Sequence, residues 1–297
     1  MVLKKVIFKG CATALVTPFT SDCSGVNFEE LRKLIEFQIL EGVDALVICG
    51  TTGESSTMSL DEKKSVIDFA VKITNKRVPI IAGTGGNNTK EVVSLSKYAE
   101  QVGADALLIV TPYYNKTTQK GLITHFKEIA TNTTLPIIMY NVPSRTGLNI
   151  EPNTCFELSK ISNIVAIKEA SGNISQVAKI ANLCKDDLTI YSGNDDQIVP
   201  ILSLGGFGVI SVLSNIYPKF VHNMVYDYLC GNWQKACASQ LYSLDLTNAL
   251  FSEVNPIPVK YALNKIGFDC GKPRLPLVEL SSENTEKIDK LLKDFAL

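Results

Sequence analysis

Residues 106–110 read ALLIV, an uninterrupted apolar run between Asp105 and Thr111. A strand with one face in water alternates apolar and polar residues, whereas a strand buried on both faces is apolar throughout. Similar short runs recur along the chain. The eight runs are Ala12–Thr17, Ala45–Cys49, Pro79–Ala82, Ala106–Val110, Pro136–Tyr140, Ile164–Lys168, Leu188–Tyr191 and Gly208–Val212. They predict the strands of a buried parallel sheet.

Amphipathic segments separate these runs and predict helices. Asn27–Leu40 opens with a capping residue followed three positions later by Glu30, and Ser59–Ile73 opens in the same way with Glu62. A side-chain oxygen at the first position and an acid three residues on satisfy the free N–H groups of a helix start. The same reading applies to Thr89–Val102, Thr118–Ala130 and Asn173–Leu183.

Eight consecutive strand–helix units predict an α/β fold, a (β/α)₈ barrel, for which ~250 residues are typical. An open doubly wound sheet is the structural alternative, but no GxGxxG follows the first run, and eight unbroken units favour closure. The strand pattern stops after Gly231, where Trp233–Phe251, Pro258–Ile266 and Glu283–Phe295 have helical periodicity. We therefore expect a catalytic barrel over residues 1–231 and a C-terminal helical domain over residues 232–297.

Composition excludes several classes of protein. The chain has 297 residues with 29 Lys+Arg against 30 Asp+Glu and no basic run, so nucleic-acid binding is not expected. No apolar stretch reaches the ~20 residues that span a bilayer, and the N-terminus lacks a secretion signal. The eight cysteines form no CxxC and are scattered, so we expect reduced packing residues in a cytoplasmic protein.

Lys168 ends the apolar run IVAIK, at the strand end where a barrel builds its active site. A lysine buried there loses hydration, and more of its neutral amine is available to attack a carbonyl group. Alternatively, Lys168 snorkels to solvent or pairs with Glu169. Its place among the hydroxyl-bearing residues described next favours a nucleophile.

Hydroxyl side chains follow the neighbouring runs. Tyr140 ends the fifth run, Tyr114 follows the fourth, and Thr51 and Thr52 follow the second within GTTGE. Hydroxyls pass protons without carrying charge, although a single tyrosine is more often a packing residue. GTTGE lacks the Lys-Ser/Thr of a phosphate-binding P-loop, so its N–H groups and threonines suit a small carboxylate equally well. Arg145 is either a solvated charge or a clamp for a substrate carboxylate.

Metal chemistry is not predicted. The two histidines, His125 and His222, lie in helical segments away from the strand ends, and the chain has neither HxH nor HExxH. For the same reason no Ser-His or Cys-His nucleophile pair is expected.

Four motifs carry a resemblance to a known family: GTTGES at 50–55, TPYYN at 111–115, YNVPSRTG at 140–147 and IKEASGN at 167–173. Together they resemble the dihydrodipicolinate synthase family, within the N-acetylneuraminate lyase superfamily, and the similarity extends over the whole chain. The resemblance implies 4-hydroxy-tetrahydrodipicolinate synthase activity: condensation of pyruvate with L-aspartate 4-semialdehyde in lysine and diaminopimelate biosynthesis.

The resemblance also implies roles for single residues. Lys168 would form a Schiff base with pyruvate, and Tyr140 would be the adjacent general acid and base. Thr51 and Tyr114 would complete a hydroxyl relay, with Tyr114 supplied by a neighbouring subunit. The family pattern implies a homotetramer, a dimer of tight dimers, that uses neither a metal nor an organic cofactor.

Substrate binding is implied in the same way. Thr51 and Thr52 would hold the pyruvate carboxylate, Gly193 and the backbone of Ile210 would close the pocket, and Arg145 would bind the carboxylate of the semialdehyde.

Relatives that lysine inhibits have an effector pocket at their dimer interface. Matching residues here are Ser55, Ser56, Asn87, Glu91 and Tyr113, whereas two positions that carry histidine in inhibited enzymes are Leu60 and Lys63. A lysine at position 63 would place like charge beside the ammonium of the effector. We therefore expect feedback inhibition by lysine to be weak or absent.

Two other functions remain open at this stage. N-acetylneuraminate lyase or a 2-keto-3-deoxy sugar acid aldolase would share the barrel, Lys168 and Tyr140, but sugar-acid lyases generally lack the arginine at the position of Arg145. A barrel that has lost catalysis and serves as a scaffold would not need Lys168, Tyr140, Tyr114, Thr51 and Arg145 together.

Overall fold

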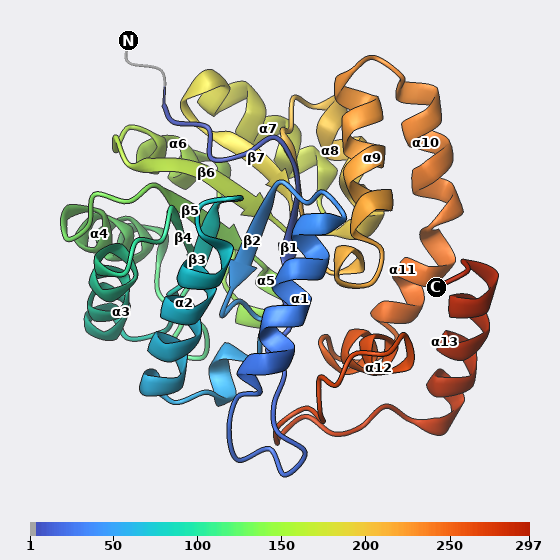
Figure 1. The fold of residues 1–297 in the computed structure, drawn as a ribbon. Helices are drawn as coiled ribbons and strands as arrows, with labels where there is room; N and C mark the ends of the chain where they lie inside the picture. The colour runs from blue at the N-terminus through green and yellow to red at the C-terminus, as the bar shows by residue number, and fades with distance from the viewer. Residues whose placement is uncertain (1–3) are drawn as a thin grey trace.

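The computed structural model describes residues 4–297, and its centre is a closed barrel of parallel strands (Figure 1). The strands pair in chain order, and β8 pairs with β1 to close the barrel. They are β1 Gly10–Ala14, β2 Ala45–Ile48, β3 Ile80–Gly83, β4 Ala106–Val110, β5 Ile137–Asn141, β6 Ile164–Glu169, β7 Thr189–Ser192 and β8 Gly208–Ser211. The predicted barrel is confirmed, and the open sheet is excluded.

The largest difference from the predicted strands is at the first run. β1 ends at Ala14, whereas the apolar run continues to Thr17. The N–H of Val16 donates to the side chain of Asn215 at 3.1 Å and not to a neighbouring strand. Leu15 and Val16 are nevertheless buried in the hydrophobic core, which accounts for their apolar character.

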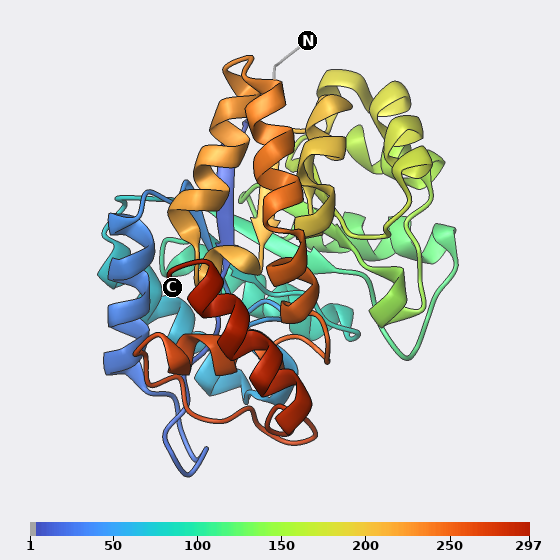
Figure 2. The same cartoon turned by 90° about the vertical axis from the view of Figure 1, so that its right-hand side faces the viewer.

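Helices cover the outside of the barrel in both views of the ribbon (Figures 1 and 2). Five match the prediction: α1 Phe28–Leu40, α2 Leu60–Thr74, α3 Thr89–Gln101, α4 Gln119–Thr131 and α7 Ile174–Cys184. The side chain of Asn27 caps α1, and Ser59 with Glu62 forms a capping box at α2. Local sequence therefore determines where these helices begin.

Four further helices were not predicted: α5 Pro143–Thr146, α6 Pro152–Ser159, α8 Ile198–Ser203 and α9 Pro218–Leu229. Three of them begin with proline, whose fixed φ and missing N–H suit the first helical position. Short 3₁₀ turns complete this part of the chain: η1 Ser55–Thr57, η2 Lys185–Asp187, η3 Asp195–Gln197 and η4 Leu213–Asn215.

The C-terminal tail consists of α10 Trp233–Tyr242, α11 Leu244–Leu250, α12 Ile257–Lys265 and α13 Ser282–Asp294. The single helix expected over 233–251 is wrong, because the chain changes direction at Ser243. α10 packs along α9, whereas α11 contacts α13 and the turns η3 and η4 after strands β7 and β8. Figure 2 shows α10 beside α9 and α13 lying below them. The division into domains at residue 231 stays a prediction.

The N-terminal end of the barrel is closed by aromatic rings. Phe8 and Tyr191 stack with their ring centroids 4.2 Å apart, and the Tyr191 hydroxyl donates to the Phe8 carbonyl at 2.8 Å. None of the described helices is long and apolar enough to span a membrane.

All eight cysteines are free. Five are buried, as expected for packing residues: Cys11, Cys49, Cys155, Cys184 and Cys270. Burial raises the pKa of Cys49 and of Cys270 to about 12, so both thiols stay protonated at neutral pH.

Candidate active site

Lys168 lies near the C-terminal end of β6, in register with Tyr140 on β5 and Tyr191 on β7. Its side chain is 5% exposed. The ammonium nitrogen Nζ lies 4.4 Å from the ring centroid of Tyr140. The expected nucleophile and the expected general acid and base are therefore in contact.

Pairing of Lys168 with Glu169 is excluded by the structure. The Glu169 carboxylate accepts hydrogen bonds from the Ser171 N–H at 2.7 Å, from the Asn141 side chain at 3.0 Å and from Gln176 at 3.3 Å. Successive residues of a strand point to opposite faces, so Lys168 points into the barrel and Glu169 points away from it. Glu169 therefore does not serve as a counterion for the buried Lys168 ammonium.

Gly193, just after β7, leaves the space beside Lys168 open. A Cβ at this position would lie 2.7 Å from the Cβ of Ala170 and 3.1 Å from Cε and Cγ of Lys168. Any side chain here would displace the lysine, which gives Gly193 a steric reason to be glycine. Ile210 on β8 is fully buried in the interior cluster that also contains Tyr140.

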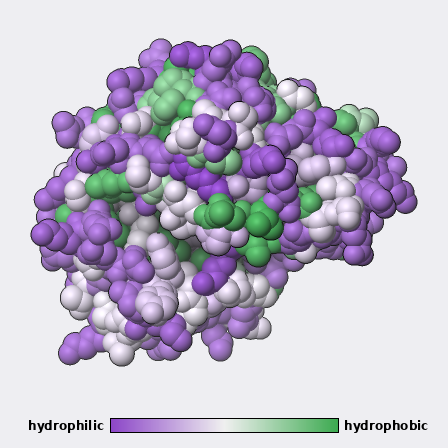
Figure 3. Space-filling view, turned by 90° about the horizontal axis from the view of Figure 1, so that it is seen from below, coloured by the Kyte–Doolittle hydropathy of each residue, from purple (hydrophilic) through white to green (hydrophobic). Residues whose placement is uncertain are grey.

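A cavity of about 220 Å³ opens at the C-terminal end of the barrel. Figure 3 looks onto this end and shows polar and apolar surface interleaved around a recess. Its polar lining residues are Thr51, Ser55, Ser56, Tyr113, Tyr140, Arg145 and Thr146. The structure therefore brings Tyr140, Thr51 and Arg145 to one cavity, with Lys168 against the Tyr140 ring.

Thr51 and Thr52 differ in their surroundings. Thr51 is exposed to the cavity, whereas Thr52 is 3% exposed and does not line it. The Thr52 hydroxyl accepts a hydrogen bond from the Asn255 side-chain amide at 2.9 Å. Because the amide N–H₂ is a donor only, the hydrogen of Thr52 is left to donate elsewhere.

Arg145 lies on the short helix α5, directly after β5. It is exposed, lines the cavity, and donates one guanidinium hydrogen bond to the Asn255 carbonyl at 3.4 Å. Its other N–H groups have no partner among residues 4–297 and can bind an anion that enters the cavity.

Tyr114 is a predicted catalytic residue that does not line the cavity of its own chain. Its side chain is 92% exposed, and its φ is 70°, in the left-handed region that non-glycine residues rarely adopt. The preceding Tyr113 lines the cavity. The TPYYN turn thus presents one tyrosine to the site and one to the outside.

The candidate effector residues divide into two groups. Ser55, Ser56 and Tyr113 line the same cavity as Tyr140. Asn87 lies next to them and donates to the Tyr113 carbonyl at 3.2 Å, whereas the Glu91 carboxylate accepts from Asn88 at 2.9 Å.

Asp195 in η3 is a buried carboxylate that sequence analysis missed. Its Oδ2 accepts from the N–H groups of Val212 and Leu213, both at 2.9 Å, and its Oδ1 has no partner among residues 4–297. Burial raises the pKa of Asp195, and the positive charge of Lys168 opposes that rise. In the sequence, this carboxylate is marked by two consecutive acidic residues, Asp195 and Asp196, shortly after Gly193.

The histidines lie away from the cavity. His222 pairs with Asp44 at 2.8 Å, and His125 contacts the Thr89 hydroxyl at 2.9 Å. Within residues 4–297, no three His, Cys, Asp or Glu side chains gather as metal ligands would.

Residues 7–295 match the model of the dihydrodipicolinate synthetase family. The chain belongs to the dihydrodipicolinate synthetase family. Among its relatives, 4-hydroxy-tetrahydrodipicolinate synthase 1 of Clostridium acetobutylicum is 59% identical over 98% of this chain and 99% of the relative. The resemblance inferred from the four motifs is confirmed.

Solved structures of family members have the same fold. The dihydrodipicolinate synthase of Acinetobacter baumannii, complexed with pyruvate, has a TM-score of 0.94 and 42% identity, covering 98% of this chain and 99% of its own. The Cyanidioschyzon merolae protein, with lysine bound, has a TM-score of 0.96 and 36% identity, covering 99% of this chain and 100% of its own.

Proposed function

We propose that this family member is a 4-hydroxy-tetrahydrodipicolinate synthase, which condenses pyruvate with L-aspartate 4-semialdehyde. The observation that carries the proposal is Lys168, which is 5% exposed with its Nζ 4.4 Å from the Tyr140 ring, beside a cavity. The synthase name of the Clostridium relative and the pyruvate complex of the Acinetobacter relative support it.

In the proposed reaction, the Lys168 amine attacks the keto carbon of pyruvate, and loss of water gives a protonated imine. The imine withdraws electrons from the adjacent methyl group, which loses a proton to form an enamine. The enamine carbon then attacks the aldehyde carbon of the second substrate. The amine of that substrate finally attacks the imine carbon, which closes the ring and releases the lysine.

Tyr140 is the proposed proton carrier, because its ring lies against Lys168 and it lines the cavity. Thr51 lines the same cavity and would extend the path of hydroxyls. We propose that Tyr114 enters the site of a neighbouring copy, which would give its exposed ring and left-handed backbone a use.

We propose two carboxylate sites, of which Thr51 and Arg145 line the cavity and the other residues lie outside its lining. Thr51 and Thr52 would bind the pyruvate carboxylate, with Gly193 and Ile210 bounding the space beside Lys168. Arg145, at the mouth, would bind the carboxylate of the semialdehyde. Sugar-acid lyases act on a polyol aldehyde, which has no carboxylate for Arg145 to bind.

Borohydride reduction with pyruvate tests the proposal. The expected result is a covalent adduct on Lys168, detected by mass spectrometry, that the Lys168→Met variant does not form. Adding aspartate 4-semialdehyde or N-acetylmannosamine as the acceptor then distinguishes the synthase from the lyase. No adduct on Lys168 would exclude both enzymes and leave a scaffold.

The oligomer and its cofactors belong to the same proposal. We propose a homotetramer of tight dimers in the cytoplasm that needs neither a metal nor an organic cofactor. Analytical ultracentrifugation measures the oligomer, and activity after exhaustive dialysis against EDTA should equal that before it. A dimer would still permit the proposed crossing of Tyr114, whereas an active monomer would exclude it.

Feedback by lysine is proposed to be weak or absent. Leu60 and Lys63 lie on α2, next to the turn that carries Ser55 and Ser56. A cation at position 63 would repel the ammonium of a lysine ligand. A titration of activity with lysine tests this, and inhibition below millimolar lysine would contradict it.

A further inference from the structure

A buried ion pair joins the loop after β2 to the C-terminal tail. Glu54, in the GTTGES motif, and Lys260, in α12, lie 206 positions apart, and their charged atoms are 2.7 Å apart. Each side chain is 1% exposed. Burial lowers the pKa of Lys260, and the Glu54 carboxylate opposes that effect. Each charge is therefore tolerated in this place because the other is present.

Among residues 4–297, the tail supplies the other hydrogen-bond partners of these two charged groups. The second oxygen of Glu54 accepts from the Arg274 N–H at 2.9 Å, and Lys260 also donates to the Lys272 carbonyl at 3.1 Å. The Lys260 Nζ and the Arg274 Cζ lie 4.2 Å and 4.0 Å, respectively, from the centroid of the Phe19 ring.

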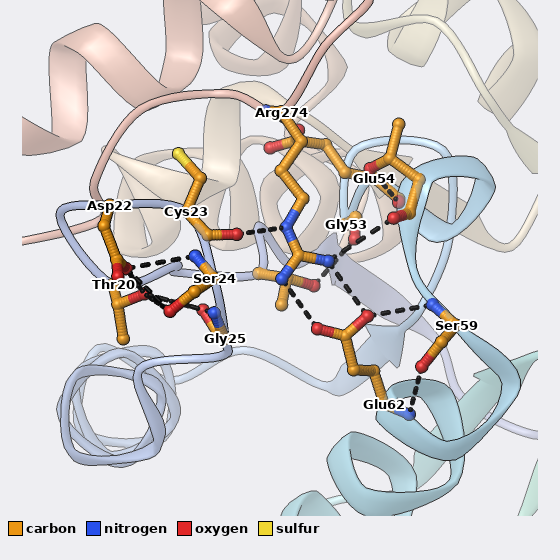
Figure 4. A network of polar contacts seen from close by, with 12 residues as sticks. Thr20, Asp22, Cys23, Ser24, Gly25, Gly53, Glu54, Ser59, Glu62 and Arg274 are labelled. Atoms are coloured by element: carbon orange, nitrogen blue, oxygen red, sulfur yellow. Dashed lines mark hydrogen bonds and ion pairs between the residues drawn. The ribbon is translucent and has the colours of Figure 1, made fainter.

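Arg274 extends the network to α2, as Figure 4 shows. Its guanidinium forms two hydrogen bonds with the Glu62 carboxylate, at 2.6 and 2.9 Å, and Nε donates to the Cys23 carbonyl at 3.0 Å. Glu62 is the residue that closes the capping box of α2. The tail thus holds the loop after β2 at Glu54 and holds the helix that follows this loop at Glu62.

The backbone transmits this restraint to the threonines. Glu54 has φ 53° and ψ 34°, a left-handed conformation that a non-glycine residue keeps only where its surroundings hold it. Its N–H donates to the Thr51 carbonyl at 3.1 Å, closing a tight turn that runs from Thr51 to Glu54 with Thr52 and Gly53 at its centre. A displacement of Glu54 would therefore move Thr51 and Thr52.

A second tail contact reaches the same turn. The Asn255 amide donates to the Thr52 hydroxyl at 2.9 Å, and the Asn255 carbonyl accepts from Arg145 at 3.4 Å. One residue of the tail thus touches both of the proposed carboxylate sites.

We propose that Glu54 and Lys260 are positioning residues for the reaction, and that the C-terminal tail holds the Thr51–Glu54 turn in the conformation in which Thr51 and Thr52 bind a carboxylate. The proposal rests on the proposed function. Replacing a buried ion pair with apolar or neutral groups often leaves stability unchanged, so stability alone does not account for this pair. The pair is better explained by the hydrogen bonds with which the tail holds Glu54, a residue of the active-site turn.

The test compares the double variant Glu54→Gln/Lys260→Met with the control Lys265→Met. The double variant removes both charges and leaves neither buried alone. Lys265 lies on the same helix and pairs with Asp289 within the tail, 46% exposed. KM for pyruvate is expected to rise about tenfold in the double variant with kcat lowered less than about threefold, the pattern of lost substrate binding. The control should match wild type in both constants.

Borohydride trapping at increasing pyruvate separates this proposal from the proposed function. No adduct on wild-type Lys168 overturns both. Wild-type trapping together with an unchanged half-saturating pyruvate concentration in the folded double variant overturns only the positioning role, even if its melting temperature falls. Should the double variant not fold, Glu54→Asp keeps the charge and shortens its reach. Pyruvate half-saturation in that variant should rise severalfold, and an unchanged value overturns the positioning role.

Discussion

Tyr140 and Tyr191 flank Lys168 on neighbouring strands, but the two tyrosines belong to opposite ends of the barrel. Tyr191 stacks on Phe8 at the N-terminal end and donates its hydroxyl to the Phe8 carbonyl. Burial raises the pKa of Tyr191 well above its usual range. Tyr140 lines the cavity at the other end. Both tyrosines are in register with Lys168, so register does not determine which of them can transfer a proton. That depends on whether the hydroxyl is already bonded, as in Tyr191, or lies at the cavity, as in Tyr140.

This difference follows the general organisation of such barrels, in which the N-terminal end contributes stability and the C-terminal end carries chemistry. At the closed end, polar groups are paired with each other, as in Tyr191 with Phe8 and His222 with Asp44. At the open end, Lys168 and Arg145 keep donors available to a ligand. Variants at the two ends should therefore affect different measurements.

The largest effect is expected for Lys168→Met at the open end. Turnover should fall about 10⁴-fold or more, because the covalent step has no other amine in the site. The melting temperature should stay close to wild type, because methionine fills a similar volume. Turnover is measured by a coupled assay of product formation, and a loss of less than tenfold would contradict the role of Lys168.

The tyrosine pair tests the comparison most directly. Tyr140→Phe should lower kcat by about 10²- to 10⁴-fold, the range for loss of a general acid or base, with little change in stability. Tyr191→Phe should destabilise the protein by about 1–3 kcal/mol, because the buried Phe8 carbonyl loses its donor. Its kcat should stay within about threefold of wild type. Steady-state kinetics and urea unfolding measure both, and equal loss of kcat in the two variants would break the comparison.

Arg145→Met should raise KM for aspartate 4-semialdehyde about 10- to 100-fold, equivalent to a lost charged hydrogen bond, and leave KM for pyruvate unchanged. In Arg145→Lys, KM for aspartate 4-semialdehyde should lie between the wild-type and Arg145→Met values, because an ammonium keeps the charge but lacks the planar fork of arginine. The matched control is Arg77→Met, whose partner Glu36 lies on α1 outside the cavity lining. A parallel rise in both KM values would place Arg145 at the pyruvate site instead.

The smallest effects concern pH and the two histidines. The hydrogen bond to Asp44 raises the pKa of His222 above its ordinary value of 6.5, so its stabilisation is complete below that value and is lost as pH rises through the folded pKa. Burial lowers the pKa of His125 to about 4, so the folded state resists protonation, and stability is lost as pH falls from 6.5 toward 4.

Melting temperatures of wild type, His222→Gln and His125→Gln between pH 4 and 9 check these signs. His222→Gln should reduce the loss of melting temperature above pH 6.5, and His125→Gln should reduce the loss below pH 6.5. Neither variant should change the other half of the pH profile. KM for pyruvate at a fixed pH should not change in either variant. A changed KM would mean that His222 on α9 or His125 on α4 is coupled to the active site.

Most of the barrel was predictable because a strand buried on both faces is apolar along most of its length. The 106–110 run and strand β4 coincide for this reason. Helices α6 and α9 were missed because their starts depend on proline and not on a capping side chain. The break at Ser243 was not predictable, since it arises from where α10 and α11 pack.

The site was predictable in its parts. Lys168 and Tyr140 end apolar runs, Thr51 and Arg145 lie two and five positions beyond the ends of theirs, and parallel strands bring these ends together. The hydrogen bond between Asn255 and Thr52 could not be predicted from local sequence, because the two residues are 203 positions apart.

By itself, the sequence determined the eight strands, the helix caps and the order of chemical groups around the barrel rim. These depend on continuous apolar runs, capping and spacing within a few tens of residues. Only the tertiary structure decided which tyrosine hydroxyl is available beside Lys168, that Glu169 points away from it, and that Lys260 neutralises Glu54. Those outcomes depend on closure of the barrel and on the tail packing back onto its rim. Both join residues too distant in the chain for any local pattern to record.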